Sequence, residues 1–261
     1  MSTVAVHHVV EGPDGAPPVV LSNSLGTTLD MWDPQVAVLA ERFRVIRYDT
    51  RGHGSSPVPL APYDIADLGT DLLALLDGLQ IKRASVCGLS LGGMTAMWVA
   101  ANAPERVERL VLCSTSARLG PPKAWSDRAA AVRAGGMATV ADTVIGRWFT
   151  DGFARREPGT VARFRDTLLS MPAEGYAACC GVVERMDLES SLGRIEAPTL
   201  ILAGAADPST PLEHAHRIAQ GIPGAQLTMV EAAHLLNVEV ADEATRAVLD
   251  HLSDMRSEEE P

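Results

Sequence analysis

The sequence predicts an α/β fold with a mostly parallel sheet and helices on both faces. Short apolar runs alternate with longer segments whose apolar residues recur at helical spacing, and this alternation favours parallel strands joined by helices. Of the 261 residues, 46% are hydrophobic and 21% are charged, as in a globular protein with a single large core.

Seven apolar runs are expected to form strands. They lie at residues 4–10, 18–22, 43–49, 83–88, 107–113, 197–204 and 225–231. Three segments between them are expected to be helices. DPQVAVLAER should begin with Asp33 as the N-cap and Pro34 as the first helical residue. DIADLGTDLLALLDGL repeats Leu at helical spacing, and LGGMTAMWVAANAP ends before a proline.

One long segment interrupts the alternation of strands and helices. No strand is predicted between residues 118 and 194, although aromatic residues gather there in a chain that is only 4% aromatic. We expect residues 118–194 to form a helical lid, inserted into a core of residues 1–117 and 195–261. The alternative is a small helical subdomain packed away from the functional site.

Charge and composition exclude several classes of partner. The formal net charge is -11, which disfavours nucleic acids and anionic membrane surfaces and means that an anionic substrate needs a local cation. No secretory signal or long apolar stretch is apparent, so a cytoplasmic location is expected. The four cysteines form no C-x-x-C pair and are predicted to be buried free thiols, so no metal site is expected. The sequence does not indicate an oligomeric state.

GLSLG, at residues 88–92, predicts a nucleophile. The pattern G-x-S-x-G is weak alone, but here it directly follows a predicted strand and precedes a predicted helix. Small residues on either side of Ser90 would tolerate a strained turn that exposes its hydroxyl. The alternative is an ordinary Gly/Ser turn.

A serine nucleophile needs a base, and the base needs an acid that orients it. Asp207 and His234 each follow a predicted strand and come after Ser90 in the expected order. None of the other six histidines has the required position. Asp49 also ends a strand, but it precedes Ser90 and is expected to organise the turn DTRGHGSS through backbone hydrogen bonds.

Two backbone amides are expected to form an oxyanion hole. The first is that of Leu91, directly after the nucleophile, and the second is that of Leu25 in the loop NSLGTTLDMW. Many proteins with such a serine motif carry His-Gly where this chain has Asn23 and Ser24, and this departure still allows the backbone donor.

Six motifs together resemble the 3-oxoadipate enol-lactonases of the α/β-hydrolase superfamily. They are NSLGT with Trp32, YDTRGHGSS, VCGLSLGGM, RWFT, EGYAACC and AAH. The resemblance runs from about Val19 to His251 and implies an α/β-hydrolase fold with a mostly parallel, eight-stranded sheet. It also implies a lactone substrate that carries a carboxylate, an acyl-enzyme on Ser90, and no metal or organic cofactor.

Other activities of the same fold stay open at this stage. A general carboxylesterase, a perhydrolase or a carbon–carbon bond hydrolase would use the same triad, and a ligand receptor could be built on the same scaffold. Epoxide hydrolases and haloalkane dehalogenases are disfavoured because they place Asp at the position of Ser90.

The substrate-binding residues are expected to come mainly from the lid. Trp148 and Tyr176 are expected to supply an apolar wall, and Trp32 and Trp125 are further candidates. Arg128 is the preferred ligand for the substrate carboxylate, because a guanidinium offers a planar fork that matches it. Arg133 and Arg147 are the alternatives, and an ordinary surface arginine is the competing interpretation.

Overall fold

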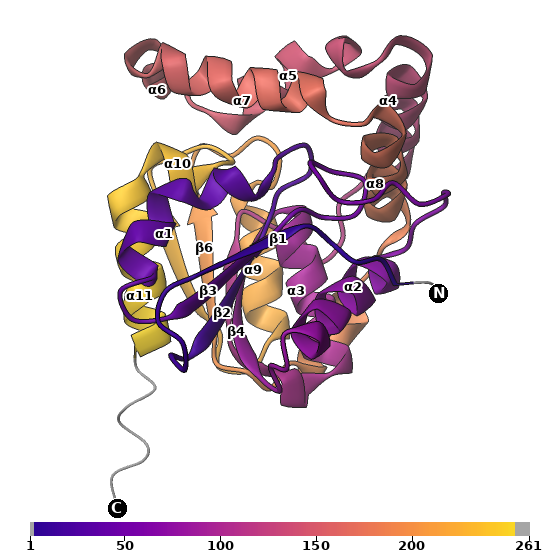
Figure 1. Cartoon of the computed structure of the whole chain (residues 1–261). Helices are drawn as coiled ribbons and strands as arrows, with labels where there is room; N and C mark the ends of the chain where they lie inside the picture. The colour runs from indigo at the N-terminus through magenta and orange to yellow at the C-terminus, as the bar shows by residue number, and fades with distance from the viewer. Residues whose placement is uncertain (1–2, 254–261) are drawn as a thin grey trace, which may run out of the picture.

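The computed structural model describes residues 3–253 and shows a seven-stranded sheet with helices on both faces (Figure 1). The strands are His8–Glu11 (β1), Pro18–Ser22 (β2), Arg44–Tyr48 (β3), Ala84–Leu89 (β4), Val107–Cys113 (β5), Thr199–Gly204 (β6) and Gln226–Val230 (β7). Their order is β1-β3-β2-β4-β5-β6-β7, and β1 is antiparallel to β3 while the other neighbours are parallel. Each strand overlaps one of the seven apolar runs, so the predicted fold class is confirmed.

The expectation of eight strands is wrong for the described residues. Two amides of the segment before β1 donate to side chains: that of Val4 to Asp71 Oδ1 at 2.9 Å, and that of His7 to Ser56 Oγ at 2.8 Å. Because these amides already have acceptors, the predicted run 4–10 becomes a strand only from His8.

Six α-helices accompany the sheet. They are Asp33–Leu39 (α1), Ile65–Gly78 (α2), Leu91–Asn102 (α3), Leu212–Gly221 (α9), Leu236–Glu239 (α10) and Ala241–Ser253 (α11). α1 packs against α11 on one face, and α2 packs against α3 on the other (Figure 1). Every residue of the interior strands β4 and β6 is buried, as expected when both faces are covered. All four cysteines are buried and free, as predicted.

The predicted N-cap of α1 is wrong by one residue. Trp32 occupies the N-cap position, so Asp33 is the first helical residue and Pro34 the second. The Asp33 carboxylate faces cations instead of capping the helix: it lies 2.7 Å from Arg47 Nη1 and 3.5 Å from Arg163 Nη1.

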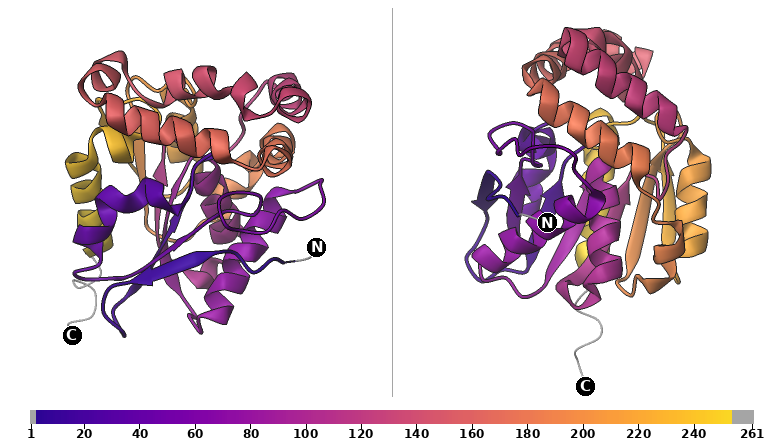
Figure 2. Two further views of the ribbon diagram at one scale, coloured as in Figure 1. Left: turned by 45° about the horizontal axis from the view of Figure 1, so that its top comes forward. Right: turned by 90° about the vertical axis from the view of Figure 1, so that its right-hand side faces the viewer.

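Residues 118–194, all of which are described, contain five α-helices and no strand. The helices are Pro122–Gly135 (α4), Ala141–Trp148 (α5), Asp151–Arg156 (α6), Pro158–Ser170 (α7) and Ala173–Arg185 (α8). They lie above the carboxyl ends of the parallel strands, with α4 packed on α8 and α5 on α7 (Figures 1 and 2). We refer to these helices as the lid. The division of the chain into lid and core at residues 118 and 194 stays a prediction. Residues 1–2 and 254–261 of the predicted core ranges lie outside the described residues.

Within residues 3–253, every helix is too short or too polar to cross a bilayer.

Candidate active site

Ser90 lies in a tight turn between β4 and α3. Its backbone angles are φ +56° and ψ -114°, a conformation that residues other than glycine rarely adopt. Neighbouring backbone fixes the turn: the Ser90 amide donates to the Cys113 carbonyl at 3.0 Å, and the Ser90 carbonyl accepts from Thr115 Oγ1 at 2.7 Å. The strand–turn–helix context expected for a nucleophile is present, and the Ser90 side chain reaches a pocket.

The glycines of GLSLG are required by close backbone contacts. A Cβ on Gly88 would lie 2.3 Å from the Gly92 carbonyl oxygen, and a Cβ on Gly92 would lie 2.1 Å from that of Ser22. Both distances are far below van der Waals contact. α3 can therefore begin directly above the ends of β2 and β4 only because these positions carry no side chain.

Asp207 and His234 are brought together by the loops after β6 and β7. His234 Nδ1 lies 2.8 Å from Asp207 Oδ2, and both side chains are buried. Since the carboxylate accepts at Nδ1, the neutral imidazole carries its proton there and leaves Nε2 free as a base. The oxygens of Asp207 also accept from the amides of Ser209 and Thr210 and from the Thr210 hydroxyl, at 2.7, 3.2 and 2.6 Å.

These contacts decide the charge of Asp207. Burial alone would raise the pKa of this carboxyl group, but interaction with His234 and the hydrogen bonds from Thr210 and Ser209 lower its pKa below the usual value. The carboxylate therefore stays ionised at neutral pH, as an orienting partner of an imidazole must.

Ser90 and His234 line the same pocket. No hydrogen bond joins the Ser90 hydroxyl and the His234 ring in the described part of the chain. Such bonds often become short only when substrate is bound.

The Asp49 carboxylate makes its hydrogen bonds with backbone amides of two loops. Its Oδ1 accepts from the Leu29 amide at 2.8 Å and its Oδ2 from the Ser55 amide at 2.9 Å. The carboxylate thus organises the loops around it, as the sequence predicted. Among the other histidines, His214 bonds to Ser116 Oγ at 2.8 Å, and His53 accepts the Gly26 amide at Nε2 at 3.0 Å.

The two residues whose amides are expected to form an oxyanion hole both lie near the pocket that Ser90 lines. Leu91 is the first residue of α3, and Leu25 lines the pocket. Within residues 3–253 neither amide has a hydrogen-bond acceptor, so both are free to donate to a ligand. A helix N-terminus also favours negative charge there.

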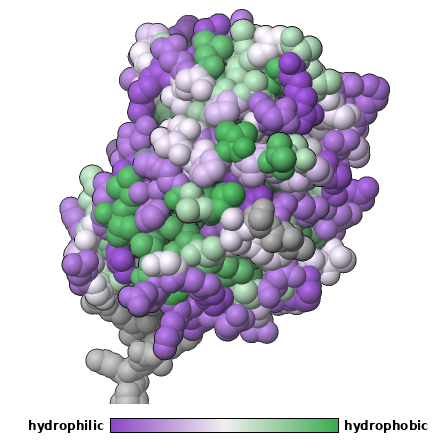
Figure 3. Space-filling model, turned by 45° about the vertical axis from the view of Figure 1, so that its right-hand side comes forward, coloured by the Kyte–Doolittle hydropathy of each residue, from purple (hydrophilic) through white to green (hydrophobic). Residues whose placement is uncertain are grey.

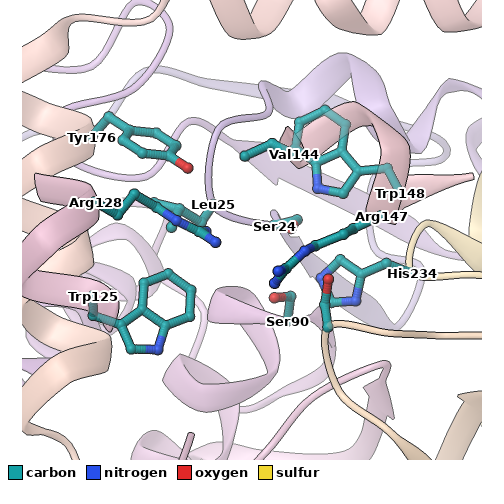
Figure 4. A pocket seen from close by; sticks show the side chains of 11 residues that line it. Ser24, Leu25, Ser90, Trp125, Arg128, Val144, Arg147, Trp148, Tyr176 and His234 are labelled. Carbon is teal, nitrogen blue, oxygen red and sulfur yellow. The ribbon is translucent and has the colours of Figure 1, made fainter. Parts of the chain in front are cut away.

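The pocket lies between the lid and the carboxyl ends of the strands. Its lining residues are Ser24, Leu25, Ser90, Trp125, Arg128, Val144, Arg147, Trp148, Tyr176, Ser209 and His234. Figure 4 shows the guanidinium groups of Arg128 and Arg147 pointing into its centre, with that of Arg147 directed toward Ser90 and His234. No Asp or Glu is among these described lining residues. In a chain of net charge -11, this pocket is a local cationic site.

Arg128 is held by an aromatic ring. Its guanidinium carbon lies 4.5 Å from the ring centroid of Trp125, at the distance of a cation–π interaction. Burial raises the pKa of the Tyr176 hydroxyl, which lies on the same side of the pocket (Figure 4), and the charge and hydrogen bond of Arg128 work against that rise. Arg133, an alternative in the sequence, instead forms a two-point ion pair with Glu174, with N–O distances of 2.9 and 2.8 Å.

The expectation for Trp32 is wrong. Its side chain is 1% exposed and packs in the hydrophobic core, and Trp32 does not line the pocket. The short 3₁₀ turn Leu29–Trp32 directs the ring toward the interior. Ser24, Val144 and Ser209 also line the pocket and were not predicted. Ser209 could have been suggested by its place in the loop after β6, two residues after Asp207.

No cluster of three or more His, Cys, Asp or Glu side chains that could hold a metal ion occurs within residues 3–253.

Several known proteins are similar to this chain over most of its length. Residues 17–240 match a family model described as "alpha/beta hydrolase fold". The 3-oxoadipate enol-lactonase 2 of Acinetobacter baylyi is 42% identical over 94% of this chain and 92% of that protein. The 3-oxoadipate enol-lactonase 1 of the same organism is 39% identical over 88% of this chain and 86% of that protein. The crystal structure of an enol-lactonase from Burkholderia xenovorans matches with a TM-score of 0.94 and 44% identity, covering 95% of this chain and 96% of that one.

Proposed function

Because this chain belongs to the alpha/beta hydrolase family, we propose that it hydrolyses 3-oxoadipate enol-lactone to 3-oxoadipate in the degradation of protocatechuate and catechol. The enol-lactonases similar to it over nearly their whole length support this substrate. The geometry of Ser90, Asp207 and His234 supports hydrolysis of an ester bond.

The reaction begins at Ser90. His234 Nε2 takes the proton of the serine hydroxyl while Ser90 Oγ attacks the lactone carbonyl, and Asp207 holds the imidazole by its Nδ1–H. The amides of Leu25 and Leu91 donate to the oxyanion. Collapse of the tetrahedral intermediate breaks the ring C–O bond and expels an enolate, which takes up a proton and becomes the ketone. Because the ketone does not readily revert, ring opening is effectively one-way.

The acyl-enzyme is then hydrolysed. His234 activates a water molecule, which attacks the acyl carbonyl and releases Ser90 with its proton restored. The product has one carboxylate more than the substrate. The scheme uses no metal or organic cofactor.

Arg128 binds the carboxylate arm of the substrate in this scheme. It lies in a pocket whose described lining has no acidic side chain, and its guanidinium carbon lies over the ring of Trp125. The pocket encloses only about 40 Å³ of free volume, room for little more than a water molecule. The guanidinium groups of Arg128 and Arg147 fill its centre (Figure 4), so both must swing aside or fold around the lactone.

The Asp207–His234 hydrogen bond, beside a serine with φ +56°, is the observation that carries the hydrolytic assignment. The test is a spectrophotometric assay of freshly generated 3-oxoadipate enol-lactone with the wild-type protein and with Ser90→Ala. Turnover by the wild type and its loss in the variant are expected. A wild-type protein that hydrolyses simple aryl esters but leaves the enol-lactone intact would contradict the substrate assignment.

A carboxylesterase or perhydrolase would have the same triad, and a ligand receptor would hydrolyse neither substrate. The aryl-ester assay separates an enzyme from a receptor, and the lactone assay separates a lactonase from an esterase. A cytoplasmic location stays a prediction.

A further inference from the structure

One carboxylate outside the triad joins the His234 loop to the lid. Glu239 ends α10, and its Oε2 accepts from the amides of Ala233 at 3.1 Å and Thr150 at 3.2 Å. Its Oε1 accepts from the Thr150 hydroxyl. Ala233 lies in the loop after β7 and Thr150 precedes α6, so this side chain bridges the sheet region and the lid.

A backbone hydrogen bond runs beside this bridge. The Leu235 amide donates to the Trp148 carbonyl at 3.0 Å. Both neighbours of His234 are therefore linked by hydrogen bonds to the segment 147–150. Leu235 is bonded to it directly, and Ala233 is linked to it through the Glu239 carboxylate. The same segment places Arg147 and Trp148 in the pocket.

The bridge requires a carboxylate. Both oxygens of Glu239 face donors, and an ionised carboxylate can only accept. The Thr150 hydroxyl accepts the Phe153 amide at 3.2 Å, which leaves its proton for Glu239. A glutamine of the same shape would turn an NH₂ group toward one of these donors, so that at least one hydrogen bond would be lost.

We propose that Glu239 is a positioning residue that fixes the segment 147–150 against His234. The lid side chains Arg147 and Trp148 then meet a substrate at Ser90 in one orientation. This inference rests on the proposed hydrolytic function. Glu239 itself lines a groove of about 520 Å³ between the lid and α10–α11 and does not line the pocket, so it acts through its neighbours.

The test compares Glu239→Gln, Thr150→Val and Thr150→Ser on the enol-lactone and on a neutral aryl ester. In Glu239→Gln and Thr150→Val, kcat should fall about tenfold on both substrates, equivalent to about 1.4 kcal/mol, while KM changes little. Thr150→Ser keeps the hydroxyl and should retain most of the wild-type kcat. The double variant Glu239→Gln/Thr150→Val should lose no more than Glu239→Gln alone, because both changes break one bridge.

Glu243→Gln is the matched control. Glu243 lines the same groove, and within the described residues its side chain has no hydrogen-bond or ion-pair partner. This variant should keep wild-type kcat. Thermal unfolding of each variant shows whether the assay temperature leaves it folded. If folded Glu239→Gln keeps the wild-type kcat, Glu239 only stabilises the lid and the proposal is overturned. A loss confined to KM for the anionic lactone overturns it as well.

Labelling of Ser90 by a neutral aryl phosphonate separates this proposal from the substrate assignment. Ser90 Oγ attacks the phosphorus and displaces the aryl oxide, so this reaction needs the serine and its base. It involves no lactone, and its rate therefore does not depend on the substrate assignment. Slower labelling of Glu239→Gln than of Glu243→Gln supports the bridge even if the wild-type protein does not hydrolyse the enol-lactone. Equal labelling rates overturn it.

Discussion

The sheet region and the lid bury their helices to different extents. In α3, which follows Ser90, ten of twelve residues are buried, whereas α4 of the lid buries two of fourteen. α8, which packs under α4, buries nine of thirteen. Elements with few buried apolar contacts open at a lower free-energy cost. The triad residues lie on the sheet region and most of the side chains that enclose the pocket lie on the lid, which we expect to open more easily.

The two regions also place their charges differently. In the sheet region, Arg51 Nε lies 2.6 Å from Asp71 Oδ2, and both side chains are almost fully buried. In the lid, Arg165 pairs with an exposed carboxylate, and hydrophilic side chains are interspersed with hydrophobic ones on its surface (Figure 3). Arg128 and Arg147 form no ion pair with any described carboxylate, which leaves both charges for a ligand. We therefore expect bond breaking to depend on the sheet region and substrate selection to depend on the lid.

The largest expected effect comes from the triad. Ser90→Ala and His234→Ala should each lower kcat/KM by on the order of 10³-fold or more while leaving a folded protein, by analogy with other triads. Asp207→Asn should also leave little activity, because an amide no longer selects the required tautomer of His234. Steady-state kinetics on the enol-lactone and circular dichroism of each variant measure these effects.

Asp49→Asn is the control for the acid. Because the Asp49 oxygens accept amides of two loops, its replacement should affect stability more than kcat. A harmless Asp207→Asn together with an inactive but folded Asp49→Asn would transfer the role of the acid to Asp49. A His234→Ala variant with near-normal turnover would remove the basis of the proposed mechanism.

The sequence predicts the sheet region well because its signals are local. Ser90, Asp207 and His234 each follow an apolar run, and parallel strands bring their carboxyl ends to one edge of the sheet. The eighth strand was wrong because it came from the resemblance alone, and no eighth apolar run in the sequence corresponds to it.

The lid was less predictable because the direction of a long side chain depends on tertiary packing. Helical periodicity does not say which arginine turns inward, and the structure shows Arg147 as well as Arg128 in the pocket. Trp32 was misplaced because proximity to the NSLGT loop in sequence does not reveal the turn that buries it. Glu239 had no signal, since two of its three donors are backbone amides, whose positions no residue pattern encodes.

The second prediction concerns His53, where the two regions meet. Its ring is fully buried, accepts the Gly26 amide and lies 6.4 Å from the Tyr176 ring of the lid. Burial lowers the pKa of His53 from 6.5 to about 4, against the weaker effect of its hydrogen bond to the Arg51 carbonyl. The unfolded chain therefore binds an extra proton between pH 6.5 and pH 4. The stability contributed by this histidine is fully present above pH 6.5 and is lost as the pH falls to 4, by about 3 kcal/mol.

Urea unfolding at several pH values, compared between the wild type and His53→Gln, measures this effect. The difference between the two proteins should shrink as the pH falls from 6.5 to 4, because glutamine does not titrate. The lowered pKa of His214 also contributes to the pH dependence, but it is present in both proteins and cancels. A constant difference across this range would mean that His53 is already protonated, or solvated, in the native state.

The third prediction tests substrate selection by the lid. Arg128→Met should lower kcat/KM for the anionic enol-lactone by about 10- to 100-fold, the range for loss of a charge-assisted hydrogen bond. Hydrolysis of a neutral aryl ester should change little, since that substrate has no carboxylate to bind. Arg165→Met, which removes an exposed lid arginine paired with Asp142, is the matched control and should affect neither substrate. Equal losses on both substrates would show that Arg128 supports the lid and that the anion site lies elsewhere.

The smallest expected effect tests whether the lid and the sheet region unfold separately. Gly175 of α8 packs directly on Gly52, and a Cβ at position 175 would lie 2.1 Å from the Gly52 carbonyl oxygen. Since backbone cannot move aside easily, Gly175→Ala should destabilise this contact by about 1–3 kcal/mol. In Gly146→Ala the new methyl group meets nothing within 4 Å, and this control should stabilise α5 slightly.

Trp125 and Trp148 lie in the lid while Trp32 and Trp98 lie in the sheet region, so unfolding of the lid alone changes part of the fluorescence. If the lid is a separate unit, urea unfolding of Gly175→Ala should show an early transition in both fluorescence and circular dichroism, because the lid also contains five α-helices, and the main midpoint should stay near that of the wild type. If a single transition instead accounts for both signals, the two regions unfold as one cooperative unit. The difference in helix burial would then describe packing only, and the hypothesis that the lid opens independently to admit substrate would be wrong.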